Sequence, residues 1–180
     1  MAVLGTIRNF FVPVTFPAPN IVVPAPPTTY TIRPLRVEHL TEVLKLNTRC
    51  FVQGDSYTKH TLNYLLNEPR TVSYRAVAAN GEIVGFAFLM VNDNASAHLT
   101  TIGIAPEHRR RNLAFKLLDH IEKAAEARGA TTMMLEVRVG NAAAQNLYRR
   151  SGYAVVQRIE KYYTNGEDCF LMMKPIPSFG

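Results

Sequence analysis

Cysteine and tryptophan are scarce in this chain, and it has no long uninterrupted apolar run. Among 180 residues only Cys50 and Cys169 are cysteines, and tryptophan is absent. Two cysteines cannot form the disulfide framework of a secreted protein of this length, so we expect a reducing, cytoplasmic location. Neither cysteine has the close spacing to histidine that zinc sites use, so we expect no metal. The polar residues that interrupt the apolar segments exclude a membrane span, and we expect no membrane partner.

The balance of charge is positive, and the composition is that of a globular protein. Twenty lysines and arginines against fourteen acidic residues give a formal net charge of +6. A basic chain favours phosphorylated or polyanionic partners, although charge does not determine the fold. With 47% hydrophobic residues, a chain of this length can bury one substantial core. We therefore expect a single folded domain.

The N-terminal residues differ from the rest. Apolar residues between Phe10 and Phe16 lead into a proline-rich run from Pro17 to Pro27. Proline fixes φ and removes amide donors, which favours an extended conformation over a helix. The prolines also interrupt the apolar stretch that a secretory signal needs. We expect residues 1–29 to form an extended arm that packs on its own domain or on a second copy, as a homodimer, and residues 30–180 to form the folded domain.

Hydrophobic spacing from Tyr30 onward predicts alternating strands and helices. Asn80-Gly81 separates two strand-like runs and is a typical two-residue hairpin turn. The predicted strands are Tyr30 to Pro34, Thr71 to Ala78, Ile83 to Val91, Leu99 to Ile104, Thr132 to Arg138, Tyr153 to Tyr163 and Cys169 to Lys174. The predicted helices carry Leu40 to Leu46, Leu62 to Leu66 after a Thr58 cap, about Asn112 to Ala127, and Ala142 to Arg150. This order predicts an α/β (α+β) fold with a mixed seven-stranded sheet and helices on both faces.

The segment between the fourth strand and the third helix carries three consecutive arginines, Arg109, Arg110 and Arg111. The unpaired amides of a helix start suit a phosphate, and the arginines add positive charge and donors. The small side chain of Ala114 lets the backbone approach a ligand closely. A solvated helix start is the alternative interpretation of an arginine run. A Walker loop is excluded because no Gly-Lys-Ser/Thr follows.

The spacing Arg109-x-x-Asn112-x-Ala114 resembles the acetyl-CoA pyrophosphate loop, Arg/Gln-x-x-Gly-x-Gly/Ala, of the GNAT acetyltransferase superfamily. The departure is Asn112, where the family usually has glycine. Asparagine is the non-glycine residue that best tolerates left-handed backbone geometry. The resemblance implies that acetyl-CoA binds here, through Arg109, Arg110, Arg111, Asn112, Leu113 and Ala114.

A second segment is similar to the RimI and NatA-type branch of that superfamily, which acetylates protein N-termini. It comprises the run Leu135 to Asn141, Leu147-Tyr148, Gly152-Tyr153 and the run Lys161 to Asp168. The resemblance covers about Thr31 to Lys174, so we expect residues 30–180 to form a GNAT domain. It implies that two central strands splay apart and that the backbone of Ile102, Gly103 and Ile104 pairs with the pantetheine arm.

Candidate catalytic residues follow from the resemblance and from general chemistry. Glu136 lies in an apolar strand, where burial would raise the pKa of its carboxyl toward that of a working base. The resemblance makes it the general base, acting through water; an ion pair with Arg138 is the alternative. Tyr148 is the proposed acid for the CoA thiolate. Asn141 is expected to bind the pantetheine arm, to cap the following helix, or both.

Four further residues are candidates for the peptide entrance: Tyr57, His98, Tyr162 and Tyr163. The two adjacent tyrosines could instead simply cover a hairpin. His98 could contact substrate, relay a proton or play a structural role.

The sequence thus predicts a peptide Nα-acetyltransferase in which the substrate amine attacks acetyl-CoA directly in a ternary complex. Its partner is a protein or peptide N-terminus, including that of a ribosomal protein, and nucleic acid is expected only through the ribosome. One alternative keeps the fold but acetylates a lysine, a polyamine or a small-molecule amine. Another is a catalytically inactive module that binds acetyl-CoA or RNA, which the arginine cluster motivates.

Overall fold

The computed structural model describes residues 22–51 and 56–177 as an α/β fold. The strands are β1 (Tyr30–Pro34), β2 (Thr71–Ala78), β3 (Ile83–Val91), β4 (Ser96–Ile104), β5 (Thr132–Arg138), β6 (Ala154–Ile159) and β7 (Cys169–Pro175). The helices are α1 (Leu40–Cys50), α2 (Lys59–Asn67), α3 (Leu113–Glu126) and α4 (Ala142–Arg150). Single 3-10 turns at Val37–His39 and Pro106–His108 precede α1 and α3. The order of elements along the chain is the predicted one.

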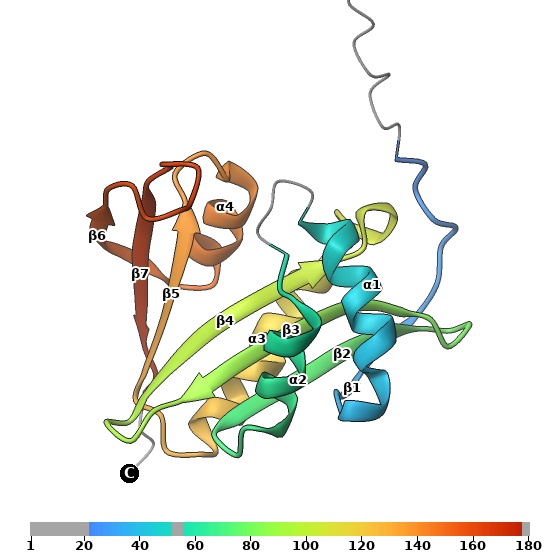
Figure 1. Cartoon of the computed structure of the whole chain (residues 1–180), viewed down its shortest axis with the longest axis horizontal. Coiled ribbons are helices and arrows are strands. Elements are labelled where there is room, and N and C mark those ends of the chain that lie inside the picture. The colour runs from blue at the N-terminus through green and yellow to red at the C-terminus, as the bar shows by residue number, and fades with distance from the viewer. Residues whose placement is uncertain (1–21, 52–55, 178–180) are drawn as a thin grey trace, which may run out of the picture.

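All strands join one seven-stranded sheet in the order β1-β2-β3-β4-β5-β7-β6. Neighbouring strands are antiparallel except β4 and β5, which run parallel, so the predicted mixed sheet is confirmed. The parallel pair is short, because only Ser96 to His98 pair with Thr132 to Met134. Beyond these residues β4 and β5 diverge, and the second half of the sheet, with α4, turns away from the first (Figure 1). The predicted splayed strand pair is therefore present.

Two strand boundaries differ from the prediction by more than one residue. The first, at the start of β4, lies at Ser96 instead of Leu99. The other is the end of β6 at Ile159, so the two adjacent tyrosines lie in a loop over residues 160–168 and not in a strand. Lys161 has a φ of +51°, which no strand residue adopts, and its amide donates to Asp168 Oδ1 at 2.9 Å. This local geometry ends β6 early.

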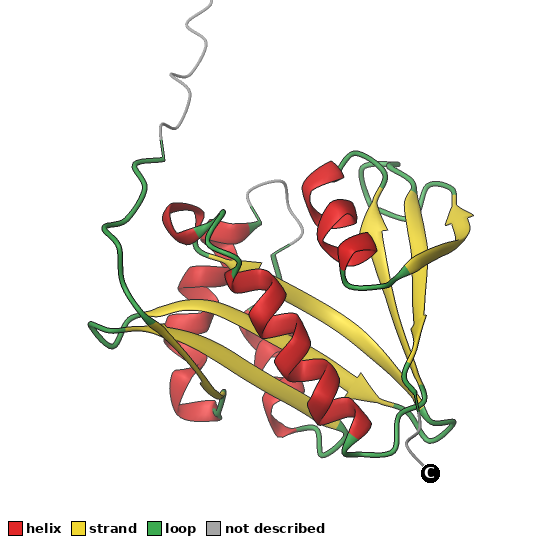
Figure 2. Ribbon diagram, turned by 180° about the vertical axis from the view of Figure 1, so that it is seen from behind, coloured by secondary structure: helices red, strands yellow, loops and turns green. Residues whose placement is uncertain are grey.

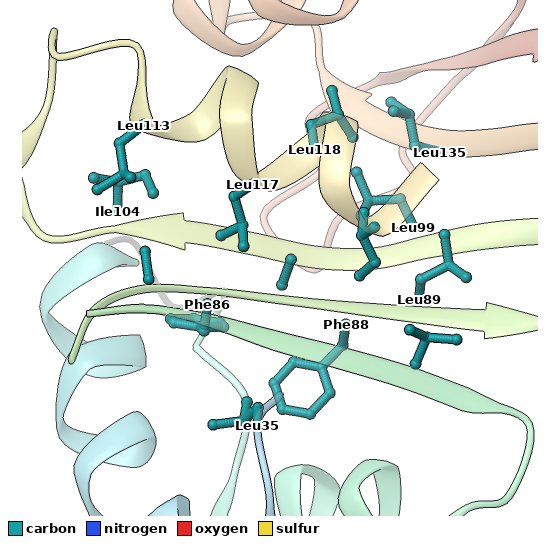
Figure 3. Close-up of a cluster of buried hydrophobic side chains, with 14 of the residues drawn as sticks. Leu35, Phe86, Phe88, Leu89, Leu99, Ile104, Leu113, Leu117, Leu118 and Leu135 are labelled. Atoms are coloured by element: carbon teal, nitrogen blue, oxygen red, sulfur yellow. The ribbon is translucent and has the colours of Figure 1, made fainter. Parts of the chain in front are cut away.

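Helices cover both faces of the first half of the sheet. Helix α3 packs across β2, β3 and β4 on one face, whereas α1 and α2 cover the other (Figure 2). Leu117 and Leu118 of α3 lie on one side of the sheet, and Phe86 and Phe88 of β3 lie on the opposite side (Figure 3). All four side chains are fully buried. No helix within the described ranges is long and apolar enough to cross a membrane.

The described end of the predicted arm contacts the domain that follows it. The Ala25 amide donates to the Glu107 carbonyl at 2.9 Å, and Arg111 donates to the Pro26 carbonyl at 2.9 Å. This part of the arm thus packs on its own domain, one of the two arrangements expected. Residues 1–21, with the apolar run before Pro17, lie outside the described residues. The homodimer through the arm stays a prediction.

Close packing at Gly103 predicts that a larger residue there destabilises the protein. A Cβ added to Gly103 would lie 2.7 Å from Cε1 of the fully buried Phe86 ring and 3.2 Å from Cys50 Sγ. We expect Gly103→Ala to lower the free energy of unfolding by about 1–3 kcal/mol, the usual cost of overpacking. Urea denaturation measures this. Glu82→Ala, at an exposed position after the β2–β3 turn, is the control and should change stability by less than about 0.5 kcal/mol. Equal stability of the two variants would contradict the prediction.

Candidate active site

The divergence of β4 and β5 leaves one edge of β4 without a strand partner. Ala105 donates to Val84 at 2.9 Å, and Gly103 lies opposite Phe86 in the β3–β4 register. Because backbone groups alternate sides along an antiparallel strand, the amides of Ile102 and Ile104 point the other way, into the gap. An extended ligand can therefore pair with them as an additional strand would.

The segment after β4 presents a second set of free amides. Asn112 immediately precedes α3 with φ 60° and ψ 11°, the left-handed conformation that the usual glycine would adopt. The amides of Leu113, Ala114 and Phe115 in the first turn of α3 donate to no acceptor within the described residues. These amides and the helix dipole suit a phosphate. The asparagine thus preserves the loop geometry that the motif requires.

The three arginines have different environments. Arg109 Nε donates to the Ile104 carbonyl at 3.1 Å, so this side chain folds back onto the end of β4. Arg111 donates to Tyr30 Oη at 2.9 Å and to carbonyls of the arm. Arg110 is exposed and has a positive φ of 63°. We expected all three side chains to donate to a phosphate. The guanidiniums of Arg109 and Arg111 already donate to protein oxygens, so Arg110 is the best candidate for this role.

Glu136 and His98 meet across the gap where the two strands separate. His98 is the last residue of β4 that pairs with β5, opposite Met134, and Glu136 follows on the same face of β5. His98 Nε2 lies 2.6 Å from Glu136 Oε2, and the two side chains are 33% and 18% exposed. An ionised carboxylate only accepts, so Nε2 carries the hydrogen in this bond. Both side chains can still be reached by solvent or substrate.

This contact overturns the expected direction of the Glu136 titration. Burial was expected to raise the pKa of the carboxyl, and partial burial does act in that direction. The hydrogen bond from His98 outweighs it, however, and holds the pKa of the Glu136 carboxyl below its usual value. Glu136 is therefore a carboxylate at neutral pH, ready to accept a proton.

The alternative ion pair between Glu136 and Arg138 is wrong. Arg138 instead donates to Glu167 Oε2 at 2.6 Å and to Asn165 Oδ1 at 3.2 Å, and it lies over the Tyr163 ring at 3.7 Å. Glu167 also accepts from the Gly140 amide at 2.9 Å. Arg138 thus anchors the 160–168 loop beside the gap and leaves Glu136 to His98.

Tyr148 and Asn141 lie at the two ends of α4. Tyr148 is 6% exposed and packs edge-on against Tyr153 at 5.8 Å. Its hydroxyl forms no hydrogen bond with the described residues, and burial raises the pKa of the phenol well above its usual value. It therefore keeps its proton at neutral pH. Asn141 accepts from the Ala144 amide at 3.0 Å, so the predicted cap is present.

The three tyrosines proposed for the entrance occupy the two sides of the gap. Tyr57 Oη donates to the Thr100 carbonyl on the open side of β4 at 3.1 Å. Tyr162 is 47% exposed, and its phenol pKa is raised first by partial burial and then by the Glu136 charge, which places it near that carboxylate. Tyr163 packs edge-on against Tyr162 at 5.1 Å. Tyr162 thus lies on the Glu136 side of the gap, whereas the Tyr163 ring lies under the Arg138 guanidinium.

Asn47 positions Tyr57 and was not among the residues predicted for the site. Its side chain is fully buried, donates to the Tyr57 carbonyl at 2.9 Å and accepts from the Tyr57 amide at 3.4 Å. The available indication was an amide side chain on the same helical face as the buried Val43 and Leu46.

Within the described ranges, no three His, Cys, Asp or Glu side chains are grouped so that they could hold a metal ion.

Comparisons with known proteins agree with this geometry. The family model described as acetyltransferase (GNAT) family matches residues 40–153. The chain is similar to the N-alpha-acetyltransferase daf-31 of Caenorhabditis elegans, at 30% identity over 81% of this chain and 82% of that protein. It is 32% identical to the N-terminal acetyltransferase A complex catalytic subunit ard1 of Schizosaccharomyces pombe, over 79% and 84% of the two chains. Among solved structures, the ribosomal-protein-S18-alanine N-acetyltransferase of Escherichia coli superposes with a TM-score of 0.76 at 30% identity, covering 84% of this chain and 97% of that one.

The His98–Glu136 hydrogen bond predicts how the carboxyl titrates. Replacing His98 with phenylalanine removes the only donor that lowers the Glu136 pKa through its side chain, while the burial that raises it stays. We expect the pKa of Glu136 to rise in His98→Phe, measured by carbon-13 NMR titration of the carboxyl. In the native protein this hydrogen bond stabilises the fold at pH values above about 4.3, the pKa of a glutamate in the unfolded state. The stabilisation is lost as the pH falls through the lower pKa that Glu136 has in the folded state.

His60→Phe is the matched control, because His60 is exposed on α2. It should leave the Glu136 titration in place. An unchanged titration in His98→Phe would contradict the assignment.

Proposed function

The chain belongs to the acetyltransferase (GNAT) family, and we propose that it transfers the acetyl group of acetyl-CoA to the α-amino group of a protein N-terminus. The observation that carries the proposal is the Glu136–His98 pair at the point where β4 and β5 separate. Free amides for a pantetheine arm and for phosphates line one side of this point. Tyr162 of the hairpin loop lies near Glu136 on the other side. Donor and acceptor can thus meet at a carboxylate.

The chain's own residues can handle each proton of the reaction. Glu136, ionised at neutral pH, takes a proton from the incoming ammonium through water. The freed amine attacks the thioester carbonyl, a C–N bond forms and the C–S bond breaks. Tyr148 keeps its proton at neutral pH and gives it to the leaving thiolate. The second proton of the amine nitrogen, lost as the amide forms, returns to the Tyr148 phenolate and restores the neutral phenol. No covalent enzyme intermediate is required.

His98 acts on Glu136 and not on the thioester. Its hydrogen bond keeps the carboxylate ionised and fixes its orientation toward the gap. Because both side chains are partly exposed, a water molecule between Glu136 and the amine has room to approach. A carboxylate with a lowered pKa is the weaker base. Glu136 is therefore fully ionised at neutral pH, but the free energy gained when it accepts a proton is smaller.

Within the class of N-termini, a ribosomal protein is the acceptor that we favour. The Escherichia coli structure at 30% identity is named for such a substrate. A net charge of +6 suits work close to ribosomal RNA. Cys50 and Cys169 are free thiols, which a reducing cytoplasm preserves.

The acceptor can be tested with paired peptides. We expect a peptide with a free N-terminus and one internal lysine to be acetylated once, at the α-amine, when acetyl-CoA is supplied. The same peptide with a blocked N-terminus should give no product, because the proposed acceptor, the free α-amino group, is then missing. Mass spectrometry locates the acetyl group. Acetylation of the lysine, or of spermidine, at a comparable rate would contradict the proposal and favour an amine acceptor of another class.

The catalytic assignments predict large losses of turnover without loss of fold. We expect Glu136→Gln and Tyr148→Phe each to lower kcat about 10²-fold or more, the usual contribution of a positioned acid or base. Steady-state kinetics with the free peptide measures this, and circular dichroism checks the fold. Tyr64→Phe, on the exposed face of α2, and Glu68→Gln, at the residue that follows this helix, make the same chemical changes and should retain native turnover. Native rates in the two site variants would contradict the roles.

A further inference from the structure

The end of the N-terminal arm is bound to the loop that precedes α3. Residues 25–30, which we call the strap, run beside residues 107–111 and are joined to them by several hydrogen bonds. The Ala25 amide donates to the Glu107 carbonyl at 2.9 Å. Arg111 donates to the carbonyls of Ala25 and Pro26 and to Tyr30 Oη. Tyr30 Oη also lies 2.9 Å from Nδ1 of the buried His108.

This loop needs external support because its backbone is unusual. Arg110 and Asn112 both have positive φ, at 63° and 60°, and neither is glycine. Non-glycine residues in this region cost free energy and persist only where surrounding contacts determine the conformation. The contacts around the loop include the Arg109 bond to the Ile104 carbonyl, the Arg49–Glu107 pair and the hydrogen bonds from the strap. The contacts from the strap therefore offset part of the free-energy cost of the left-handed backbone at Asn112, a cost that glycine at this position would not have.

The strap also fixes a positive charge beside the helix start. Every hydrogen-bond acceptor of Arg111 within the described residues is a neutral oxygen, so its charge is not cancelled. The neighbouring Glu107, in contrast, is paired with Arg49 at 2.5 Å. Arg111 lies two residues before the free amides of α3 and adds to their attraction for an anion. Its guanidinium is held in place by carbonyls that belong to the arm.

We propose that the strap is a positioning element for acetyl-CoA. It holds Arg111 and the 107–112 loop in the conformation that receives the pyrophosphate, and so the arm sets the affinity for the donor without touching the acceptor. This inference rests on the proposed binding of acetyl-CoA at this loop. Arg111 and Tyr30 are positioning residues, and their loss should change donor binding and leave the chemical step intact.

Two deletions test the strap. Removing residues 1–21 leaves it in place, whereas removing residues 1–29 takes away the Ala25 and Pro26 carbonyls and ends just before β1. We expect the longer deletion to raise the dissociation constant of CoA, and the KM for acetyl-CoA, about tenfold. The kcat and the KM for the peptide should stay within about twofold of native values. The shorter deletion should bind CoA as the full chain does. Calorimetry gives the dissociation constant, and circular dichroism checks that both deletions fold.

Point variants of the full chain test the same contacts without the risk of unfolding. Tyr30→Phe removes the hydroxyl that joins Arg111 to His108 and should weaken CoA binding about threefold. Arg111→Lys keeps the charge but loses the forked donor, and it should weaken binding comparably if position matters as well as charge. Tyr64→Phe, whose hydroxyl donates to Glu68, is the matched control and should bind CoA normally.

The outcomes separate the strap from the proposed function. If Tyr30→Phe, Arg111→Lys and the folded longer deletion all bind CoA like the full chain, the strap proposal fails while the donor site stands. If the KM for the peptide rises instead, the arm acts on the acceptor side and the proposal also fails. If the full chain itself binds no CoA, the donor site is wrong and the strap proposal falls with it.

Discussion

The separation of β4 and β5 after three paired residues is the constraint on which the rest of this structure depends. Strands normally continue to pair because each unpaired backbone group loses a hydrogen bond. Here the open side of β4 is partly satisfied by side chains from elsewhere, since Tyr57 binds the Thr100 carbonyl and Arg109 the Ile104 carbonyl. The amides of Ile102 and Ile104 remain available. The gap thus presents unpaired backbone amides, and for this reason we propose it as the binding surface for the pantetheine arm.

The far half of the sheet has to be held at a defined angle for such a gap to persist. Glu122 of α3 accepts from Tyr153 Oη at 2.7 Å and from Lys174 Nζ at 2.6 Å. These bonds connect α3 to the residue before β6 and to β7. Tyr153 in turn packs against Tyr148. One polar cluster therefore connects the first half of the sheet to the tyrosine proposed as the acid. The phenol of Tyr148 is thus linked to α3 through the ring of Tyr153.

Charge within the gap is arranged by partners more than by burial. His98 lowers the pKa of the Glu136 carboxyl and Arg138 is paired with Glu167, whereas for Tyr148 burial raises the pKa of the phenol and keeps its proton in place. The same is true of the arginine run, in which three consecutive residues have three different environments. Adjacent arginines thus have different hydrogen-bond partners, and the partners of Arg111 belong to the strap.

Much of this molecule follows from local sequence. Apolar periodicity predicts the strands and helices in the correct order, and the motifs around Asn112 and Glu136 indicate the family, because both depend on residues close together in the chain. The roles of Glu136 and Tyr148 are still predictions.

The exact end of β6 could not be predicted from the sequence, since it depends on the side chain of Asp168 folding back to Lys161. The partner of Glu136 was also beyond reach, because His98 is 38 positions away and meets it only through the β4–β5 register. Sequence alone determined which elements form and which chemistry is available, whereas the tertiary structure decided which charged groups pair, because pairing depends on distances that no periodicity contains.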